Sequence, residues 1–260
     1  MRSQPDNQQH NQQHTVVVIP TYNERENLPV VCQQVLQATG GRVHILVVDD
    51  NSPDGTGDLA DELAVQHPQI HVLHRERKEG LGRAYVAGFK QALDMGYRLI
   101  AQMDADLSHD PRDLPALIQH TAYADVVIGS RYVPGGDVSN WSRQRFWLSF
   151  CANQYVKWIT RIPVRDATGG YRCWRREVLE AIGLDTIRSN GYAFQIEMAY
   201  RAYRHGFHIQ EIPIVFTERR AGRSKLSKRV IWEAIWLPWK LRFSRIHNPS
   251  IIGRDPVPPV

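Results

Sequence analysis

An apolar run that ends in two carboxylates, Leu99-Ile100-Ala101-Gln102-Met103-Asp104-Ala105-Asp106, is the stretch that most directly indicates the fold. The run is typical of a buried strand, and the aspartates follow it directly. Carboxylates are hard oxygen ligands, and Mg²⁺ or Mn²⁺ usually takes one or two of them together with phosphate oxygens and water. Open α/β sheets bind ligands beyond the carboxyl ends of their strands. The stretch therefore predicts a site for a divalent cation and a diphosphate, with a solvated turn as the plainer alternative.

Short apolar runs recur through the first half of the chain. They are rich in β-branched residues, which is typical of strands buried on both faces of a parallel sheet. The predicted strands are 16–19, 45–48, 70–73, 99–103 and 126–128, and the helices predicted between them are 25–38, 56–66, 82–95 and 112–121. This alternation predicts an α/β doubly wound fold with a mostly parallel sheet.

The second half of the chain is more helical. Helices are predicted over 141–160, 174–183 and 192–205, a strand over 209–216, and a last helix over 227–243. On that last helix Trp232, Trp236, Trp239 and Phe243 recur at intervals that place them on one face. Such a face either packs on the rest of the protein or, with basic residues around it, lies on a membrane surface.

The composition limits the classes of partner. The formal net charge is +5, which indicates either a solubilising surface or attraction to phosphates or to an anionic membrane. Basic residues are scattered until the last third of the chain, which argues against nucleic acid. The three cysteines, Cys32, Cys151 and Cys173, lie far apart and are interpreted as free thiols in a reducing compartment. No apolar run is long enough for a transmembrane helix.

Polar clusters follow the first two predicted strands, at residues 20–27 and 49–56. An acidic residue after the second strand of an α/β sheet can accept hydrogen bonds from a ribose or a base. Capping turns are the alternative, and a turn is the preferred interpretation of residues 51–55. Gly80-Leu81-Gly82 precedes a predicted helix, where it could either cradle a phosphate or allow tight packing.

Six of these blocks, taken in order, resemble the polyprenol (dolichol) monophosphate mannose synthases, a group within glycosyltransferase family 2 that has a GT-A fold. The blocks are residues 20–28, 48–56, 103–109, 129–132, 166–172 and 222–226. The resemblance implies an inverting enzyme that moves mannose from GDP-mannose to a polyprenyl phosphate, giving a β-mannosyl phosphate and GDP. It also implies Mg²⁺ or Mn²⁺ as cofactor.

The resemblance further implies a role for individual residues, matched motif by motif. The donor nucleotide would contact Pro20, Tyr22, Glu24, Val48, Asp50 and Ala105. The metal and the diphosphate would be held by Asp104 and Asp106, with Ser108 as a weak third ligand. Arg219 and Lys225 would clamp the donor diphosphate, and Arg131, Arg145 and Ser149 would meet the acceptor phosphate. The catalytic set would then be Asp104, Asp106, Arg131, Arg219 and Lys225.

We therefore expect a disordered tail over 1–14, a GT-A catalytic domain over 15–226, an amphipathic aromatic and basic helix over 227–247, and an extended tail over 248–260. The expected location is cytoplasmic, peripheral on the cytoplasmic face of a membrane. Alternatively, a membrane-anchoring partner subunit would hold the protein at the membrane. Two other functions stay open: a related synthase that uses UDP-glucose or another nucleotide sugar, and a noncatalytic nucleotide-binding subunit of a membrane complex.

Overall fold

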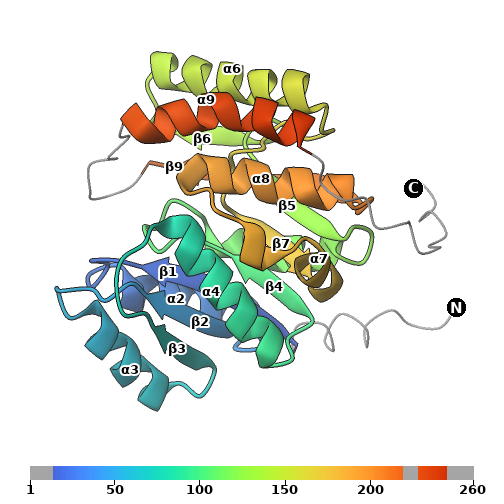
Figure 1. The fold of residues 1–260 in the computed structure, drawn as a ribbon. Helices are drawn as coiled ribbons and strands as arrows, with labels where there is room; N and C mark the ends of the chain where they lie inside the picture. The colour runs from blue at the N-terminus through green and yellow to red at the C-terminus, as the bar shows by residue number, and fades with distance from the viewer. Residues whose placement is uncertain (1–13, 219–227, 245–260) are drawn as a thin grey trace, which may run out of the picture.

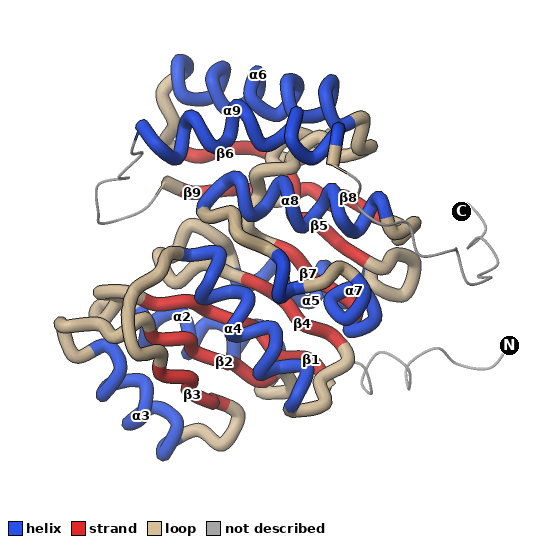
Figure 2. The backbone as a smooth tube through the Cα atoms, in the orientation of Figure 1, coloured by secondary structure: helices blue, strands red, loops and turns tan. Residues whose placement is uncertain are grey.

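The computed structural model describes residues 14–218 and 228–244, which are built around one seven-stranded sheet (Figures 1 and 2). In spatial order the strands are β3 (Ile70–His74), β2 (His44–Asp49), β1 (Thr15–Thr21), β4 (Leu99–Gln102), β7 (Arg172–Arg175), β5 (Val126–Ser130) and β8 (Ile209–Pro213). Only β7 runs antiparallel to its neighbours. The predicted mostly parallel α/β sheet is confirmed.

The strands are apolar throughout because both faces of the sheet are covered. Along β1, Val16 and Val18 enter one hydrophobic cluster, while Val17 and Ile19 enter the other. The first cluster is completed by α4 (Leu81–Asp94) and α8 (Gly191–Arg204), and the second by α2 (Leu28–Thr39), α3 (Thr56–Gln66) and α5 (Leu114–His120). Figure 1 shows α4 and α8 in front of the sheet. This alternation of side chains is what a strand buried on two faces requires.

Two helices from distant parts of the chain lie side by side beyond α8. These are α6 (Arg143–Thr160) and α9 (Lys228–Phe243), which contact each other, and α9 also packs on α8 (Figure 1). Leu237 and Leu241 of α9 are buried in the first cluster. Among the described residues, no helix is long and apolar enough to cross a membrane. The predicted last helix is therefore present, and its leucine face packs inward.

Shorter elements complete the fold. A separate two-stranded parallel sheet joins β6 (Asp137–Ser139) to β9 (Val215–Thr217). The remaining elements are η1 (Pro111–Asp113), α7 (Arg176–Ala181) and η2 (Leu184–Thr186).

Two predicted elements were wrong in detail. The helix predicted over 174–183 begins only at Arg176, because Cys173 and Trp174 belong to the central strand β7 and are fully buried. The strand predicted over 209–216 breaks at Ile214 into β8 and β9, which pair in different sheets. Residues 1–13 of the tail predicted over 1–14, the segment 219–227 and residues 245–260 lie outside the described residues.

Candidate active site

The carboxyl ends of β1, β2, β4 and β5 and the loop that enters β7 meet at one edge of the sheet. At this edge the chain turns sharply after each of three strands. Asn23, Asn51 and Leu107 have φ angles of 60°, 56° and 61°. Such left-handed backbone is uncommon for residues other than glycine, and strained positions of this kind cluster at functional sites. The edge is therefore the candidate active site.

Asp104 is held in one orientation by residues from two other elements. The hydroxyl of Tyr85, on α4, donates a hydrogen bond of 2.8 Å to Oδ1 of Asp104. The backbone N–H of Asp104 donates a hydrogen bond of 3.2 Å to Nδ1 of His109. The His109 ring stacks on Tyr171, with centroids 4.9 Å apart. Burial, and then the charge of Asp104, raise the pKa of Tyr85 far above its usual value, so its hydroxyl keeps the proton that it donates. The sequence analysis missed Tyr85, which reads as an ordinary apolar position of a helix.

Asp106 and Ser108 lie next to Asp104 and are buried. The backbone N–H of Ser108 donates a hydrogen bond of 3.0 Å to Oδ1 of Asp106. The hydroxyl oxygen of Ser108 is buried and has no hydrogen-bond partner among residues 14–218 and 228–244. A buried hydroxyl without a partner is costly unless something binds it. The donor set of two carboxylates and one orphaned hydroxyl therefore fits a hard divalent cation.

The protein alone offers few ligands for that cation. Within residues 14–218 and 228–244, no three His, Cys, Asp or Glu side chains are grouped so that they could hold a metal ion. Mg²⁺-type sites often use only one or two carboxylates and take the rest of their ligands from water and substrate phosphates. The arrangement suits a metal that arrives with a diphosphate better than a permanently bound one.

The predicted nucleotide residues lie where β1 and β2 end, except Ala105, which follows the neighbouring strand β4. Pro20, Val48 and Ala105 are buried, while Tyr22 and Glu24 are partly exposed. The two strand ends are tied together by the N–H of Asp50, which donates to the carbonyl oxygen of Thr21 over 3.0 Å. The structure therefore brings this predicted set to a single strip of the sheet edge.

Two cations that the sequence analysis missed lie on this strip, both in the loop after β3. The guanidinium of Arg75 donates to the carboxylate of Asp50, and Nζ of Lys78 lies 3.5 Å from the centroid of the Tyr22 ring. Burial raises the pKa of Asp50, although Arg75 opposes this shift. No motif in the sequence marks either residue, because the contacts span more than twenty positions.

The structure shows the roles of two segments that had two interpretations in the sequence, residues 51–55 and residues 80–82. In the 51–55 turn the Asp54 carboxylate accepts hydrogen bonds from the N–H and the hydroxyl of Thr56, which agrees with the turn interpretation. At Gly82 a Cβ atom would lie 2.5 Å from the carbonyl oxygen of Ser189, and the Gly82 N–H donates to the side chain of Asn190. Gly82 therefore allows tight packing at the start of α4.

Arg131 follows β5 and is paired with Asp166 in the interior. Its Nε and Nη2 donate to the two carboxylate oxygens over 2.7 and 2.6 Å, and its backbone N–H donates over 3.0 Å. Burial by itself would raise the pKa of Asp166, but the charge and hydrogen bonds of Arg131 hold it below its usual value. The same pair raises the pKa of Arg131 against the effect of burial. Arg131 is therefore a rigid, permanently charged group, and Asp166 is a partner that the sequence analysis missed.

Arg145 and Ser149 lie on α6 and face the same region. Ser149 Oγ accepts a hydrogen bond of 2.7 Å from the hydroxyl of Tyr132, the neighbour of Arg131. Arg145 pairs with Glu218 over 2.5 Å, and both side chains are partly exposed. The structure thus gathers the three predicted acceptor residues. Arg219 and Lys225 lie outside the described residues.

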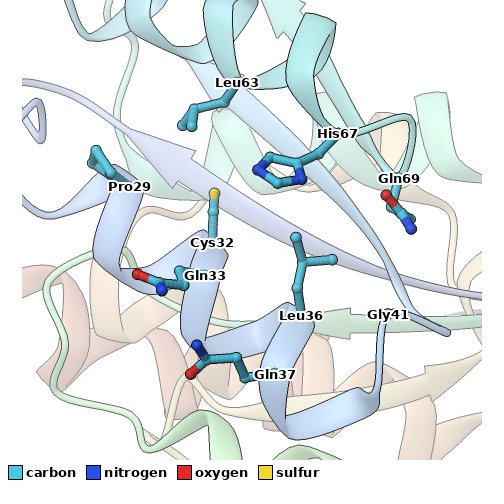
Figure 3. Close-up of a pocket in the computed structure, with 9 residues that line it drawn as sticks. All are labelled: Pro29, Cys32, Gln33, Leu36, Gln37, Gly41, Leu63, His67 and Gln69. Atoms are coloured by element: carbon cyan, nitrogen blue, oxygen red, sulfur yellow. The ribbon is translucent and has the colours of Figure 1, made fainter.

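A cavity of about 540 Å³ lies elsewhere, between α2 and α3 (Figure 3). Figure 3 shows Cys32, Leu36, Leu63 and His67 around it. Burial raises the pKa of Cys32 to about 12, so this thiol is not a nucleophile near neutral pH. The cavity contains none of the predicted site residues.

The chain is similar in sequence to one protein family and to two proteins of that kind. The model of the family described as Glycosyl transferase family 2 matches residues 16–183. The chain is 52% identical over 234 residues to the polyprenol monophosphomannose synthase of Mycolicibacterium smegmatis, and the aligned region covers 88% of each chain. It is 47% identical over 220 residues to the undecaprenyl-phosphate mannosyltransferase of Micrococcus luteus, covering 85% of this chain and 90% of that protein.

Two solved structures share the architecture at low identity. One is a glucosyl-3-phosphoglycerate synthase from Mycobacterium tuberculosis in complex with Mn²⁺, uridine diphosphate and phosphoglyceric acid (TM-score 0.64, 18% identity, 88% of this chain and 78% of that one). The other is the mannosyltransferase PcManGT from Pyrobaculum calidifontis in complex with GDP-Man and Mn²⁺ (TM-score 0.55, 18% identity, 88% and 72%). These likenesses confirm the expected GT-A-like fold.

Proposed function

The chain belongs to glycosyl transferase family 2, and from this premise we propose that it transfers mannose from GDP-mannose to a polyprenyl phosphate. The observation that carries the proposal is the identity of 52% to a polyprenol monophosphomannose synthase over 88% of both chains. A second relative, at 47% identity, is named as a mannosyltransferase acting on undecaprenyl phosphate. Both names specify the same sugar and the same class of lipid acceptor.

The donor side of the proposal rests on the strip of residues at the ends of β1 and β2. Asp50 and Glu24 offer carboxylate oxygens to a ribose or a guanine, and Tyr22 offers a ring on which a base could stack. Arg75 and Lys78 already lie against two of these groups. A structural neighbour of the same fold holds GDP-Man, which supports GDP-mannose as the donor.

The metal side of the proposal rests on Asp104, Asp106 and Ser108. We propose that these residues hold Mg²⁺ or Mn²⁺ together with the donor diphosphate, as suits two carboxylates beside an orphaned buried hydroxyl. The bound ion would offset the negative charge that builds on the departing diphosphate. Two structural neighbours contain Mn²⁺. By sequence we assign Arg219 and Lys225 the same electrostatic task.

The acceptor side needs orientation more than proton transfer. A phosphate monoester is already anionic near neutral pH, so no general base has to activate it. The remaining difficulty is bringing a second anion to an anionic donor. We assign the compensating positive charge mainly to Arg145, and the orientation of the phosphate to Arg131, whose charge is largely offset by Asp166. Direct displacement at the anomeric carbon of an α-linked donor inverts its configuration, so the proposed product is a β-mannosyl phosphate.

We further propose that α6 and α9 bring the site to the membrane surface. Trp147 and Trp158 of α6 are 59% and 74% exposed, and Trp236 and Phe243 of α9 are 63% and 75% exposed. The leucine face of α9 packs inward, which leaves Trp236 and Phe243 facing outward. Exposed aromatics beside cations such as Lys240 are typical of helices that lie in a membrane interface. These exposed side chains support a peripheral location.

Turnover with defined substrates tests the proposed function. Purified protein is incubated with Mg²⁺ or Mn²⁺, a polyprenyl phosphate in detergent, and either GDP-mannose or UDP-glucose, and the lipid product is identified by mass spectrometry. We expect mannosyl phosphate from GDP-mannose only, with the β configuration by NMR. A glucosylated lipid would favour the alternative synthase. Absence of product with every donor, from protein that binds GDP, would favour a noncatalytic subunit.

A further inference from the structure

Trp141 has a buried indole N–H group that has no acceptor in the described part of the chain. Trp141 lies in the loop between β6 and α6, directly before Ser142, the N-cap of α6. Its Nε1 is shielded from water, and none of the described residues accepts a hydrogen bond from it. Indole N–H groups nearly always find a partner when they are buried, because an unpaired donor costs free energy. The arrangement indicates that an acceptor other than residues 14–218 and 228–244 completes the site.

The ring of Trp141 lies against both of the predicted acceptor arginines. The Cζ atom of Arg145 is 4.2 Å from the ring centroid, and that of Arg131 is 5.5 Å away. Phe216 meets the indole edge-on at 5.6 Å and also lies 5.4 Å from the Cζ of Arg131. Aromatic faces attract guanidinium groups, so one indole organises two cations that would otherwise repel each other.

The two arginines differ in how firmly their present partners hold them. Arg131 is locked by buried Asp166. Arg145 is paired with partly exposed Glu218, and exposed ion pairs contribute little free energy. A phosphate, with more charge and more oxygens than a carboxylate, can therefore replace Glu218 on Arg145. Because the guanidinium of Arg145 lies against the Trp141 ring, such an exchange would bring the phosphate close to Trp141.

We propose that Trp141 is a further acceptor-binding residue, which donates its indole N–H to the acceptor phosphate and holds Arg131 and Arg145 at the spacing that this phosphate needs. The proposal rests on the proposed function, because it names a contact to that acceptor. Its ligand chemistry is a phosphate monoester that displaces Glu218. It also explains why an indole, rather than a simple apolar ring, occupies this position.

Two variants separate the two parts of the role. Trp141→Phe keeps an aromatic face but removes the N–H, and Trp141→Leu removes both. We expect Trp141→Phe to raise the KM for a short-chain, water-soluble polyprenyl phosphate about tenfold or more, which corresponds to the loss of one hydrogen bond to a charged group. Trp141→Leu should raise it further. The KM for GDP-mannose should change little in both variants. Tyr123→Phe, which removes one polar group from an exposed aromatic side chain outside the site, is the matched control and should keep the parent values.

A spectroscopic measurement distinguishes binding from packing. In protein labelled with ¹⁵N-tryptophan, the indole resonance missing from Trp141→Phe identifies Trp141. Addition of the same polyprenyl phosphate without donor should shift that resonance, and inorganic phosphate should shift it in the same direction more weakly. An unmoved Trp141 resonance at saturating acceptor, or a parent-like KM in Trp141→Phe, would overturn the inference. If the parent enzyme turned over no polyprenyl phosphate, the proposed function itself would have failed.

Discussion

Replacing Asp166 with asparagine should destabilise the protein strongly, because this carboxylate neutralises a cation that water cannot reach. Asp166 is fully buried, and Arg131 donates three hydrogen bonds to it. Asparagine has nearly the same shape but only one acceptor oxygen, and its NH₂ group would face a guanidinium. The variant therefore retains a buried positive charge without its counter-ion.

Breaking a buried ion pair by removing one partner typically costs about 3–5 kcal/mol. In a domain of about this size, each kcal/mol lowers the melting temperature by about 2–4 °C. Asp166→Asn should thus melt about 6–20 °C below the parent, as measured by circular dichroism. Asp185→Asn is the control, because Asp185 is 82% exposed in its pair with Lys90. An exposed pair of that kind is worth at most about 1 kcal/mol.

The pH dependence provides an independent check. The pKa of Asp166 lies below its usual value in the folded protein, so its ionised form stabilises the fold above the unfolded-state pKa of about 3.9. That contribution falls as the pH drops through the lower folded-state pKa. The stability gap between the parent and Asp166→Asn should therefore be constant near neutral pH and shrink below about pH 4. A variant that melts with the parent at pH 7, or a gap that widens in acid, would refute the reasoning.

Three further changes test other parts of the site. Asp106→Asn should lower turnover by orders of magnitude with an unchanged circular dichroism spectrum, because a neutral oxygen replaces a carboxylate ligand; near-normal activity would remove Asp106 from the proposed metal site. Tyr85→Phe removes the hydroxyl that orients Asp104, so a titration of activity against Mn²⁺ should require about tenfold more metal, and an unchanged midpoint would limit Tyr85 to packing. The parent should float with anionic liposomes in low salt and be released by high salt, whereas the triple variant Trp232→Ala, Trp236→Ala, Trp239→Ala should float less; equal flotation of the folded variant would exclude this face as the anchor, and no flotation of the parent would favour a partner subunit.

Much of the fold could be predicted because each parallel strand is a short, continuous apolar run. Val16–Ile19 and Ile45–Val48 have no polar face, so they had to be covered on both sides. The central strand β7 could not be recognised in this way. Its sequence, Arg172-Cys173-Trp174-Arg175, contains two arginines and leads directly into a helix, so local preference favoured helix. Pairing with β4 and β5 on either side overrides that preference.

Residues of the site that follow strands could be predicted, whereas those that support them could not. Parallel strands bring their carboxyl ends to one edge, so acidic residues that directly follow a strand, such as Asp50 and Asp104, can be recognised as site candidates from the sequence. Tyr85 contacts Asp104, which is 19 positions away, and Asp166 contacts Arg131, which is 35 positions away. Trp141 contacts Arg131 and Arg145, which are at most 10 positions away. These contacts form only in the folded chain. No local pattern distinguishes the three residues from core aromatics or turn residues.

The two predicted acceptor arginines, Arg131 and Arg145, differ in how firmly a carboxylate partner holds them, and this difference suggests a separate task for each. The charge of Arg131 is largely cancelled by Asp166, so under the proposed function this residue would orient the phosphate more than attract it. Arg145 has a partner that a stronger anion can replace, so we expect it to supply the attraction for the acceptor phosphate. One fixed and one exchangeable cation suit an enzyme that must bring two anions together and then release a charged product. If both arginines were as deeply paired as Arg131, the phosphate would find no available cation; if both were as exposed as Arg145, nothing would hold its direction of attack.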